Sequence, residues 1–347
     1  MRFRALTLFL LLAALLFVAM PLRAQTIEDY AGEFLELGVG ARSLALGGAG
    51  AAISEDATAG YWNPAGLNMI KFPSVTAMHE TRFDGTVSYD YGAFATPLSA
   101  NSSAALSILH IAVNNILDTR NALVDLNNNG QLDPGEYLNY DNVTTFSNYD
   151  WVAILSYAKE IDPELSWGVN AKLIDRRLDL QTTGTGIGFD VGTRYTPNDQ
   201  LTLAAVAEDI TTTLLSYTTG TKELVSPTVI LGGAYEWRIT ADGAHRMMPT
   251  ADIDLRFENR GQDAMLYVGP ISADFHEGIE YRYKDLFAIR GGYNDMQMWS
   301  VGAGIIISRL HIDYAYLGAN AQDQLGATHR ISISFDLQNP KWKRSGE

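Results

Sequence analysis

The sequence predicts an all-β fold, a transmembrane antiparallel up-and-down β-barrel of about 14 strands with an N-terminal plug segment in its lumen. Three observations predict the barrel, and the small residues of the N-terminal segment predict the plug. Apolar and polar residues alternate with a period of two through most of the chain after residue 73. The connections between the alternating segments are short and long in turn. A secretory signal opens the chain and directs it out of the cytoplasm.

Charge and composition narrow the class of protein. The 347 residues contain 25 Lys and Arg against 40 Asp and Glu, a formal net charge of −15, which argues against a nucleic-acid partner. The absence of cysteine excludes disulfides, thiolate metal sites and cysteine nucleophiles. A mean hydropathy of −0.04 is too low for a bundle of membrane helices, but it is compatible with strands whose apolar residues alternate with polar ones.

The N-terminus has the three parts of a signal peptide. Arg2 and Arg4 precede an apolar run from Leu8 to Met20, and Ala24 supplies the small residue before a cleavage site. A spanning helix needs roughly twenty apolar residues, so a membrane anchor is the less favoured alternative. We expect residues 1–24 to be removed and the mature chain to reach the bacterial outer membrane.

The alternating segments have an apolar side that ends in aromatic residues. From Thr228 to Trp237, for example, Val229, Leu231 and Tyr235 alternate with small or polar residues. Segments of about ten residues with this pattern are typical of strands that face lipid. A water-soluble β-sandwich shares the alternation and is the alternative.

Connection lengths favour the barrel. Strands are expected to start near residues 73, 86, 102, 148, 164, 185, 200, 227, 248, 273, 286, 298, 309 and 326. Tight connections such as 162–163 and 197–199 alternate with long ones, above all 114–147 and 211–226. Outer-membrane barrels sort their connections in this way between the periplasmic and extracellular ends.

The polar side of the strands carries many charges, which we expect to line the lumen. They include Asp190, Arg194, Asp252, Asp254, Arg256, Glu280, Arg282, Arg290 and Arg330. The first interpretation is a lattice of ion pairs, and the alternative is a polar route or gate beside the plug.

The longest connection contains a calcium-loop pattern. Its oxygen ligands would be Asp125, Asn127, Asn129, Gln131, Asp133 and Glu136, with Gly130 at the bend. Ca²⁺ takes six to eight oxygens, which this spacing can supply. No long amphipathic helix flanks the loop, so we expect structural Ca²⁺ in an extracellular insertion, residues 114–147. The alternative is a solvated polar turn without an ion.

Residues 33–72 differ from the strands. They are rich in Gly and Ala, lack sustained alternation and suit a segment packed inside something narrow. A phosphate-binding role for Gly38-Val39-Gly40 is weak, because no strand–helix unit surrounds it. We expect Arg42 and the Asn63-Pro64 turn to hold this segment as a plug, with Asp252 or Glu280 as partners for Arg42.

Four motifs of this segment resemble the opening of the PorV/PorQ family. They are Gly38-Val-Gly-Ala-Arg42, Gly47-Gly48, Asp56-Ala57 and Tyr61-Trp-Asn-Pro-Ala-Gly-Leu67. Asn63–Leu67 is shared with the wider group of FadL-like barrels. The resemblance implies a plug over 25–72 and a barrel over 73–337. It also implies a role in protein secretion or surface assembly that resembles type IX secretion. The calcium loop and the tail, residues 338–347, depart from the family pattern.

Two function classes remain open. The PorV/PorQ resemblance implies secreted cargo or secretion-system proteins as partners, and FadL-like barrels instead pass hydrophobic small molecules across the outer membrane. Outer-membrane lipid is a partner in both. We expect no enzyme, because hydrolase and phosphate-loop motifs are missing and His276 and His311 suit hydrogen-bonded networks beside acids.

Overall fold

The computed structural model describes residues 7, 32–82, 85–257, 260–261, 264–318, 327–339 and 342–344. The predicted signal peptide, Thr7 apart, lies outside the described residues, as do the first residues of the predicted plug segment and half of the tail.

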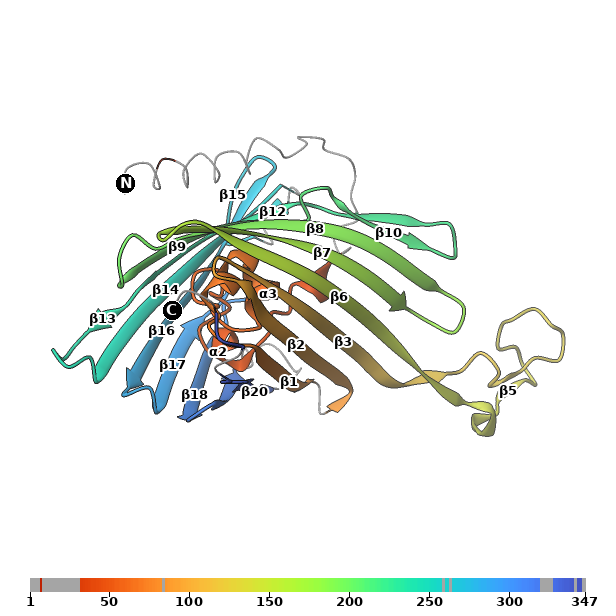
Figure 1. Cartoon of the computed structure of the whole chain (residues 1–347). Helices are drawn as coiled ribbons and strands as arrows, with labels where there is room; N and C mark the ends of the chain where they lie inside the picture. Colours follow the sequence, from red (N-terminus) through yellow and green to blue (C-terminus); the bar gives the residue numbers. More distant parts are fainter. Residues whose placement is uncertain are drawn as a thin grey trace.

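Long antiparallel strands dominate the described residues and close into one barrel (Figure 1). The sheet segments are β1 Ser74–Arg82, β2 Val87–Ser99, β3 Ser102–Asp118, β6 Thr144–Asp162, β7 Leu165–Arg177, β8 Thr183–Tyr195, β9 Leu201–Glu208, β10 Thr213–Tyr217, β11 Lys222–Val225, β12 Thr228–Tyr235, β13 Trp237–Arg238, β14 His245–Arg256, β15 Leu266–Val268, β16 Ile271–Tyr283, β17 Phe287–Tyr293, β18 Trp299–Ile307, β19 Leu310–Leu317 and β20 Thr328–Asp336. The first and last strands pair with each other, with Val75 opposite Phe335, so the ring of strands is closed.

The strand number agrees with the prediction. Eighteen segments form the sheet of the described residues. With β9–β10 and β11–β13 each counted as one interrupted strand and the short β15 left out, they make the closed 14-strand antiparallel barrel. A β-sandwich is excluded because the sheet closes on itself.

The interruption between β9 and β10 was not predicted. Asp209 and Thr212 have φ of 52° and 60°, a left-handed conformation that ends β9 before β10 begins. β9 pairs with β12, whereas β10 pairs with β11. The expected long loop over 211–226 is therefore largely a β10–β11 hairpin that extends the barrel wall.

The outer face of the barrel is apolar. Large side chains stand exposed on strands around the ring, among them Leu106, Leu155, Ile187, Ile289, Ile305 and Ile333. Such a continuous apolar surface is unfavourable in water and is typical of the lipid-facing side of a membrane barrel.

The inner face carries the charges that the alternation predicted. Asp190, Arg194, Asp252, Asp254, Arg256, Glu280, Arg290 and Arg330 are all buried, and Arg282 is half-buried. This confirms the inward assignment of these positions.

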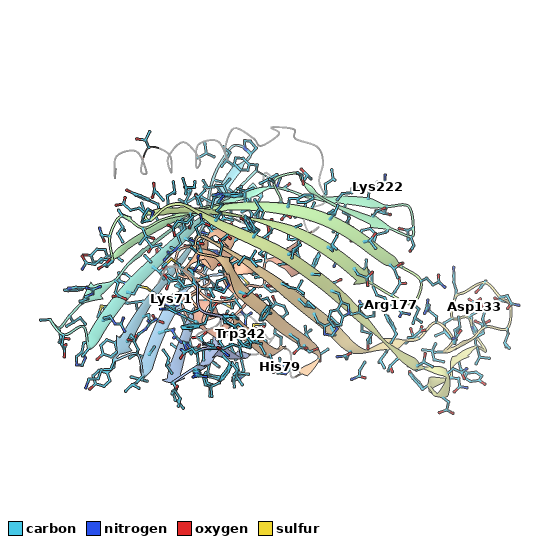
Figure 2. All side chains as sticks on the ribbon, in the orientation of Figure 1. Lys71, His79, Asp133, Arg177, Lys222 and Trp342 are labelled. Atoms are coloured by element: carbon cyan, nitrogen blue, oxygen red, sulfur yellow. The ribbon has the colours of Figure 1, made fainter. Side chains whose placement is uncertain are left out.

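The connections are sorted between the two ends. Ser99–Ser102, Asp162–Leu165, Tyr283–Phe287 and Ile307–Leu310 are tight links at the end where β1 begins and β20 stops. At the other end β3 and β6 continue well beyond the barrel and carry the small sheet of β4 Leu123–Val124 and β5 Tyr137–Leu138, with η4 Tyr140–Asn142 (Figure 1). Asp133 lies in this projection, far from the barrel (Figure 2).

The remaining helices are short and belong to the N-terminal segment. They are η1 Glu33–Leu35, α2 Ala41–Leu44, α3 Ala59–Trp62 and η2 Pro64–Met69. Figure 1 shows α2 and α3 within the ring of strands. None of the described helices is long and apolar enough to cross a bilayer.

The outer face yields a stability prediction. Ile289 is 49% exposed and pairs with Ala303 at the middle of β18, whereas Ile307 is 60% exposed at the end of that strand. We expect Ile289→Arg to lower the free energy of unfolding in lipid bilayers by about 2–4 kcal/mol and Ile307→Arg by at most about 1 kcal/mol, because the cost of a charge in lipid depends on depth. Denaturant titration of the barrel in vesicles measures both, and equal losses would contradict a lipid-facing outer surface.

Candidate functional site

Small residues bring the N-terminal segment against the barrel wall. Gly47 and Gly48 have φ of 71° and 90°, which favour glycine. A Cβ on Gly47 would collide with the backbone oxygens of Tyr293 and Glu277, and one on Gly292 would collide with Leu46 and Gly47. Glycine on both sides therefore permits backbone contact between the segment and β17.

Arg42, the first predicted plug residue, binds the wall through a carboxylate. Its Nε and Nη2 donate to the two carboxylate oxygens of Glu280, each at 3.0 Å. Arg282 and Arg290 donate to the same carboxylate, each at 2.6 Å. Although burial alone disfavours its charge, the Glu280 carboxylate raises the pKa of Arg42 above its ordinary value. Glu280 is one of the two partners that the sequence suggested.

The Asn63-Pro64 turn, which holds the other two predicted plug residues, joins the segment to itself and to β8. Asn63 Nδ2 donates to the carbonyls of Ala51 and Thr193, both at 3.1 Å, and its Oδ1 caps η2 by accepting from Ala65 N at 3.0 Å. Pro64 occupies the first turn of η2, where a missing N–H costs nothing. All three residues are thus in place for the predicted anchoring, and plugging itself stays a prediction.

The C-terminal tail fastens the segment at the tight-turn end of the barrel. Arg344 is 7% exposed and donates to Ile70 O at 3.0 Å, Asn68 Oδ1 at 3.0 Å and Ser103 Oγ at 2.6 Å. The labelled Lys71 and Trp342 mark this region (Figure 2), where Lys71 O accepts from Arg344 N at 2.9 Å. The sequence carried no signal for this contact, because an Arg near a chain end is usually solvated.

A cavity of about 320 Å³ lies inside the barrel between this segment and the long-loop end. The N-terminal segment contributes Leu37, Tyr61 and Trp62 to its lining, and the wall contributes Ile230 and Leu317. Charged residues complete the lining: Glu33, Glu36, Arg82, Glu208, Asp252, Asp254, Arg256, Arg260, His276, Asp295 and Arg330. The volume falls in the range of small-molecule sites.

The cationic side chains of the cavity wall already have partners. Arg256 donates to Asp274 at 2.7 Å and to Glu36 at 3.1 Å. Arg82 and Arg330 both bind Glu80, which lies behind them, and Arg260 binds Asp274. His276 lies 3.3 Å from Asp254 and its Nδ1 is 2.8 Å from Gly47 O, a network of the kind expected for it.

Sequence reasoning found part of this cavity. It placed Asp252, Asp254, Arg256 and Arg330 on the inward face, but it singled out neither Glu208 nor the aromatic pair 61–62 as cavity residues. Glu208 ends β9 at the unpredicted interruption, so its exposure to the lumen depends on where that strand breaks.

The predicted calcium ligands form a compact turn in the projecting loop. Asp125 accepts backbone N–H donors from Gly130 at 2.7 Å and Asn128 at 2.6 Å, and these bonds lower its pKa. Asn127 and Asn129 donate their side-chain amides to Asp133 at 2.8 and 2.7 Å. Glu136 accepts from the backbone of Leu126 and Asp133, at 2.8 and 2.9 Å, and Gln131 N donates to Asn129.

The turn is not a preformed metal site. The described residues contain no group of three or more His, Cys, Asp or Glu side chains placed to hold an ion. The amides of Asn127 and Asn129 would have to turn their oxygens inward before Ca²⁺ could bind, so the calcium site stays a prediction.

Comparison with solved structures shows which known proteins have a similar fold. The chain is similar to the toluene transporter TodX of P. putida (TM-score 0.57, 13% identity, covering 88% of this chain and 100% of that one) and to the toluene transporter TbuX of Ralstonia pickettii (0.55, 15%, 87% and 99%). A Pseudomonas aeruginosa FadL homologue is also similar (0.53, 12%, 86% and 98%). No protein-family model and no curated protein matches the chain. The fold is that of the FadL-like outer-membrane barrels, and none of these comparisons supports the PorV/PorQ assignment.

The contact between Arg42 and Glu280 yields a conductance prediction. Arg42→Ala removes the bidentate anchor but leaves Glu280 paired with two arginines of the wall, so the barrel should still assemble. We expect the free energy of unfolding to fall by about 1–3 kcal/mol and the conductance in planar bilayers to rise, because the segment is less firmly held.

The matched control is Arg282→Ala, which removes another donor to Glu280 from β16 without touching the segment. Conductance of Arg42→Ala no higher than that of the parent would show that Arg42 does not hold a plug.

Proposed function

We propose that this protein carries small molecules with an apolar part across the bacterial outer membrane. The observation that carries the proposal is the cavity of about 320 Å³ enclosed by a barrel whose fold is shared with the two toluene transporters. The cavity faces the long-loop end, where a molecule from outside would arrive, and the N-terminal segment separates it from the tight-turn end. A ligand that enters the lumen therefore has a binding site before it meets the segment.

The contacts of the segment suit a movable barrier. Arg42, Asn63 and Arg344 hold it by hydrogen bonds and ion pairs that water or neighbouring groups can replace. The segment itself is built from short helices and glycine turns, so it can rearrange without breaking a long helix.

A role in protein secretion is the second candidate. It rests on the motifs over 38–67 and on the projecting β3–β6 hairpin, which offers a surface for a protein partner outside the barrel. Secretion genes beside this gene would favour it, and genes for breakdown of apolar compounds would favour transport.

Narrowing the cavity tests transport. Thr228 lines the cavity and is buried, whereas Thr185 is exposed on the outer face of β8. We expect Thr228→Trp to reduce uptake of labelled toluene by cells that express the protein at least tenfold, because the indole fills the lumen. Thr185→Trp should leave uptake unchanged. Heat-modifiable gel mobility confirms assembly of both variants, and uptake that is equal in both would count against a route through this cavity.

We also propose that the loop over 125–136 binds one Ca²⁺ with Asp125, Asn127, Asn129, Gln131, Asp133 and Glu136. The support is the spacing of the ligands, Gly130 at φ 75° and the convergence of Asp133 and both asparagines in one turn. Extracellular sites of this kind bind with dissociation constants of about 10⁻⁴–10⁻³ M.

Limited proteolysis tests the calcium site. EGTA should expose cleavage within 114–147, and Glu136→Gln should have the same effect, because either removes the ion that orders the loop. The barrel should survive chelation, since binding contributes only about 1 kcal/mol at a few times Kd. Cutting that is the same with and without calcium would leave the motif as an ordinary polar turn.

A further inference from the structure

We infer that the lumen cavity binds an organic cation, a molecule that carries an amine or quaternary ammonium group on an apolar body. This inference rests on the proposed transport function and names its substrate class. Four features of the cavity carry it: an unpartnered buried carboxylate oxygen, a second carboxyl group without a partner, cations that are already paired, and aromatic side chains in the same lining.

Asp252 carries the unpartnered oxygen. The residue is 2% exposed and lines the cavity from β14. Its Oδ2 accepts from Ala51 N at 2.8 Å, whereas its Oδ1 has no hydrogen-bond partner. A buried acceptor without a donor is costly, and a cationic N–H donor or an ammonium group would offset that cost.

Glu208 supplies a second carboxylate on the same cavity. No hydrogen bond or ion pair joins its side chain to another group in the described part of the chain. The nearby Lys172 is engaged elsewhere, since its Nζ lies 2.7 Å from Asp190 and 2.6 Å from Asp209. Glu208 therefore lines the cavity with a carboxyl group that has no hydrogen-bond or ion-pair partner among the described residues.

The charges of the cavity favour a cation over an anion. Among the described lining residues there are six carboxyl groups, on Glu33, Glu36, Glu208, Asp252, Asp254 and Asp295, against four arginines, at 82, 256, 260 and 330, and His276, which lies 3.3 Å from Asp254. Glu80 and Asp274, behind the lining, bind these arginines as well. An anionic ligand would have to displace a carboxylate from an arginine, whereas a cation meets oxygens that have no donor.

Apolar surface adjoins the acids. Tyr61 and Trp62 lie edge to face, with ring centroids 5.1 Å apart, and both line the cavity with Leu37 and Ile230. Aromatic faces attract organic cations, and the aliphatic side chains suit an apolar body. A neutral hydrocarbon would fill the same space but would leave Asp252 and Glu208 unpaired.

Calorimetry with probes that share a phenyl ring and differ in charge tests the inference. The full chain in detergent is titrated with benzyltrimethylammonium, benzyl alcohol and benzoate. We expect the cation to bind at least tenfold more tightly than the other two. Glu208→Gln and Asp252→Asn should each weaken cation binding at least threefold and leave benzyl alcohol unchanged. Asp199→Asn removes the same charge from a side chain that is 87% exposed, on a tight turn, and should change nothing.

Two outcomes overturn the inference: binding of benzyl alcohol or benzoate as tight as that of the cation, or cation binding that survives both cavity variants. Glu208→Gln keeps the test valid if Asp252→Asn fails to assemble, because no hydrogen bond or ion pair of the described residues involves the Glu208 side chain. Uptake measurements separate this inference from the proposed function. Cation binding without uptake would refute only the transport function. Uptake of toluene, together with equal binding of the cation, benzyl alcohol and benzoate, would refute only the cation site.

Discussion

Closure of the sheet between β1 and β20 is the constraint on which the rest of the structure depends. Once the sheet is closed, every second side chain points into a narrow lumen, and the charges among them lose most of their water. They must find partners inside. Glu280 meets this need with three arginines, and one of these, Arg42, comes from the N-terminal segment. The same closure removes sheet edges and leaves the apolar face to lipid.

The N-terminal segment packs against the inner wall of the barrel because its residues are small. Leu46, Ala51 and Ile53 pack against Ala204, Val206, Ile230 and Ala234 of the wall, and Gly47 reaches the backbone of β17. Larger residues would hold the segment away from the strands and would leave the inward polar groups without donors. Its anchors at Arg42, Asn63 and Arg344 are spread along the barrel, so one lost contact would loosen a part of it.

The inferred cation site illustrates how barrels of one fold can differ in the ligand that they bind. A FadL-like barrel supplies a closed wall and an internal segment, but the side chains on its inner face decide what is bound. Here Asp252, with one oxygen that has no donor, and Glu208 line the same cavity as Tyr61 and Trp62. We infer that such a lining favours a molecule with both a positive charge and an apolar surface, because the charged group supplies donors to the acids and the apolar part is removed from water.

The sequence by itself determined the 14-strand barrel, the strand starts to within a few residues, and the buried side of residues such as Asp252 and Arg330, because period-two alternation is a local property of the chain. It also marked the N-terminal segment as one that packs closely. Only the tertiary structure decided that Arg42 meets Glu280, 238 residues away, that β9 ends at Glu208, and that Arg344 binds beside Asn68. These contacts depend on closure and register, which bring distant residues together and leave no trace in local periodicity.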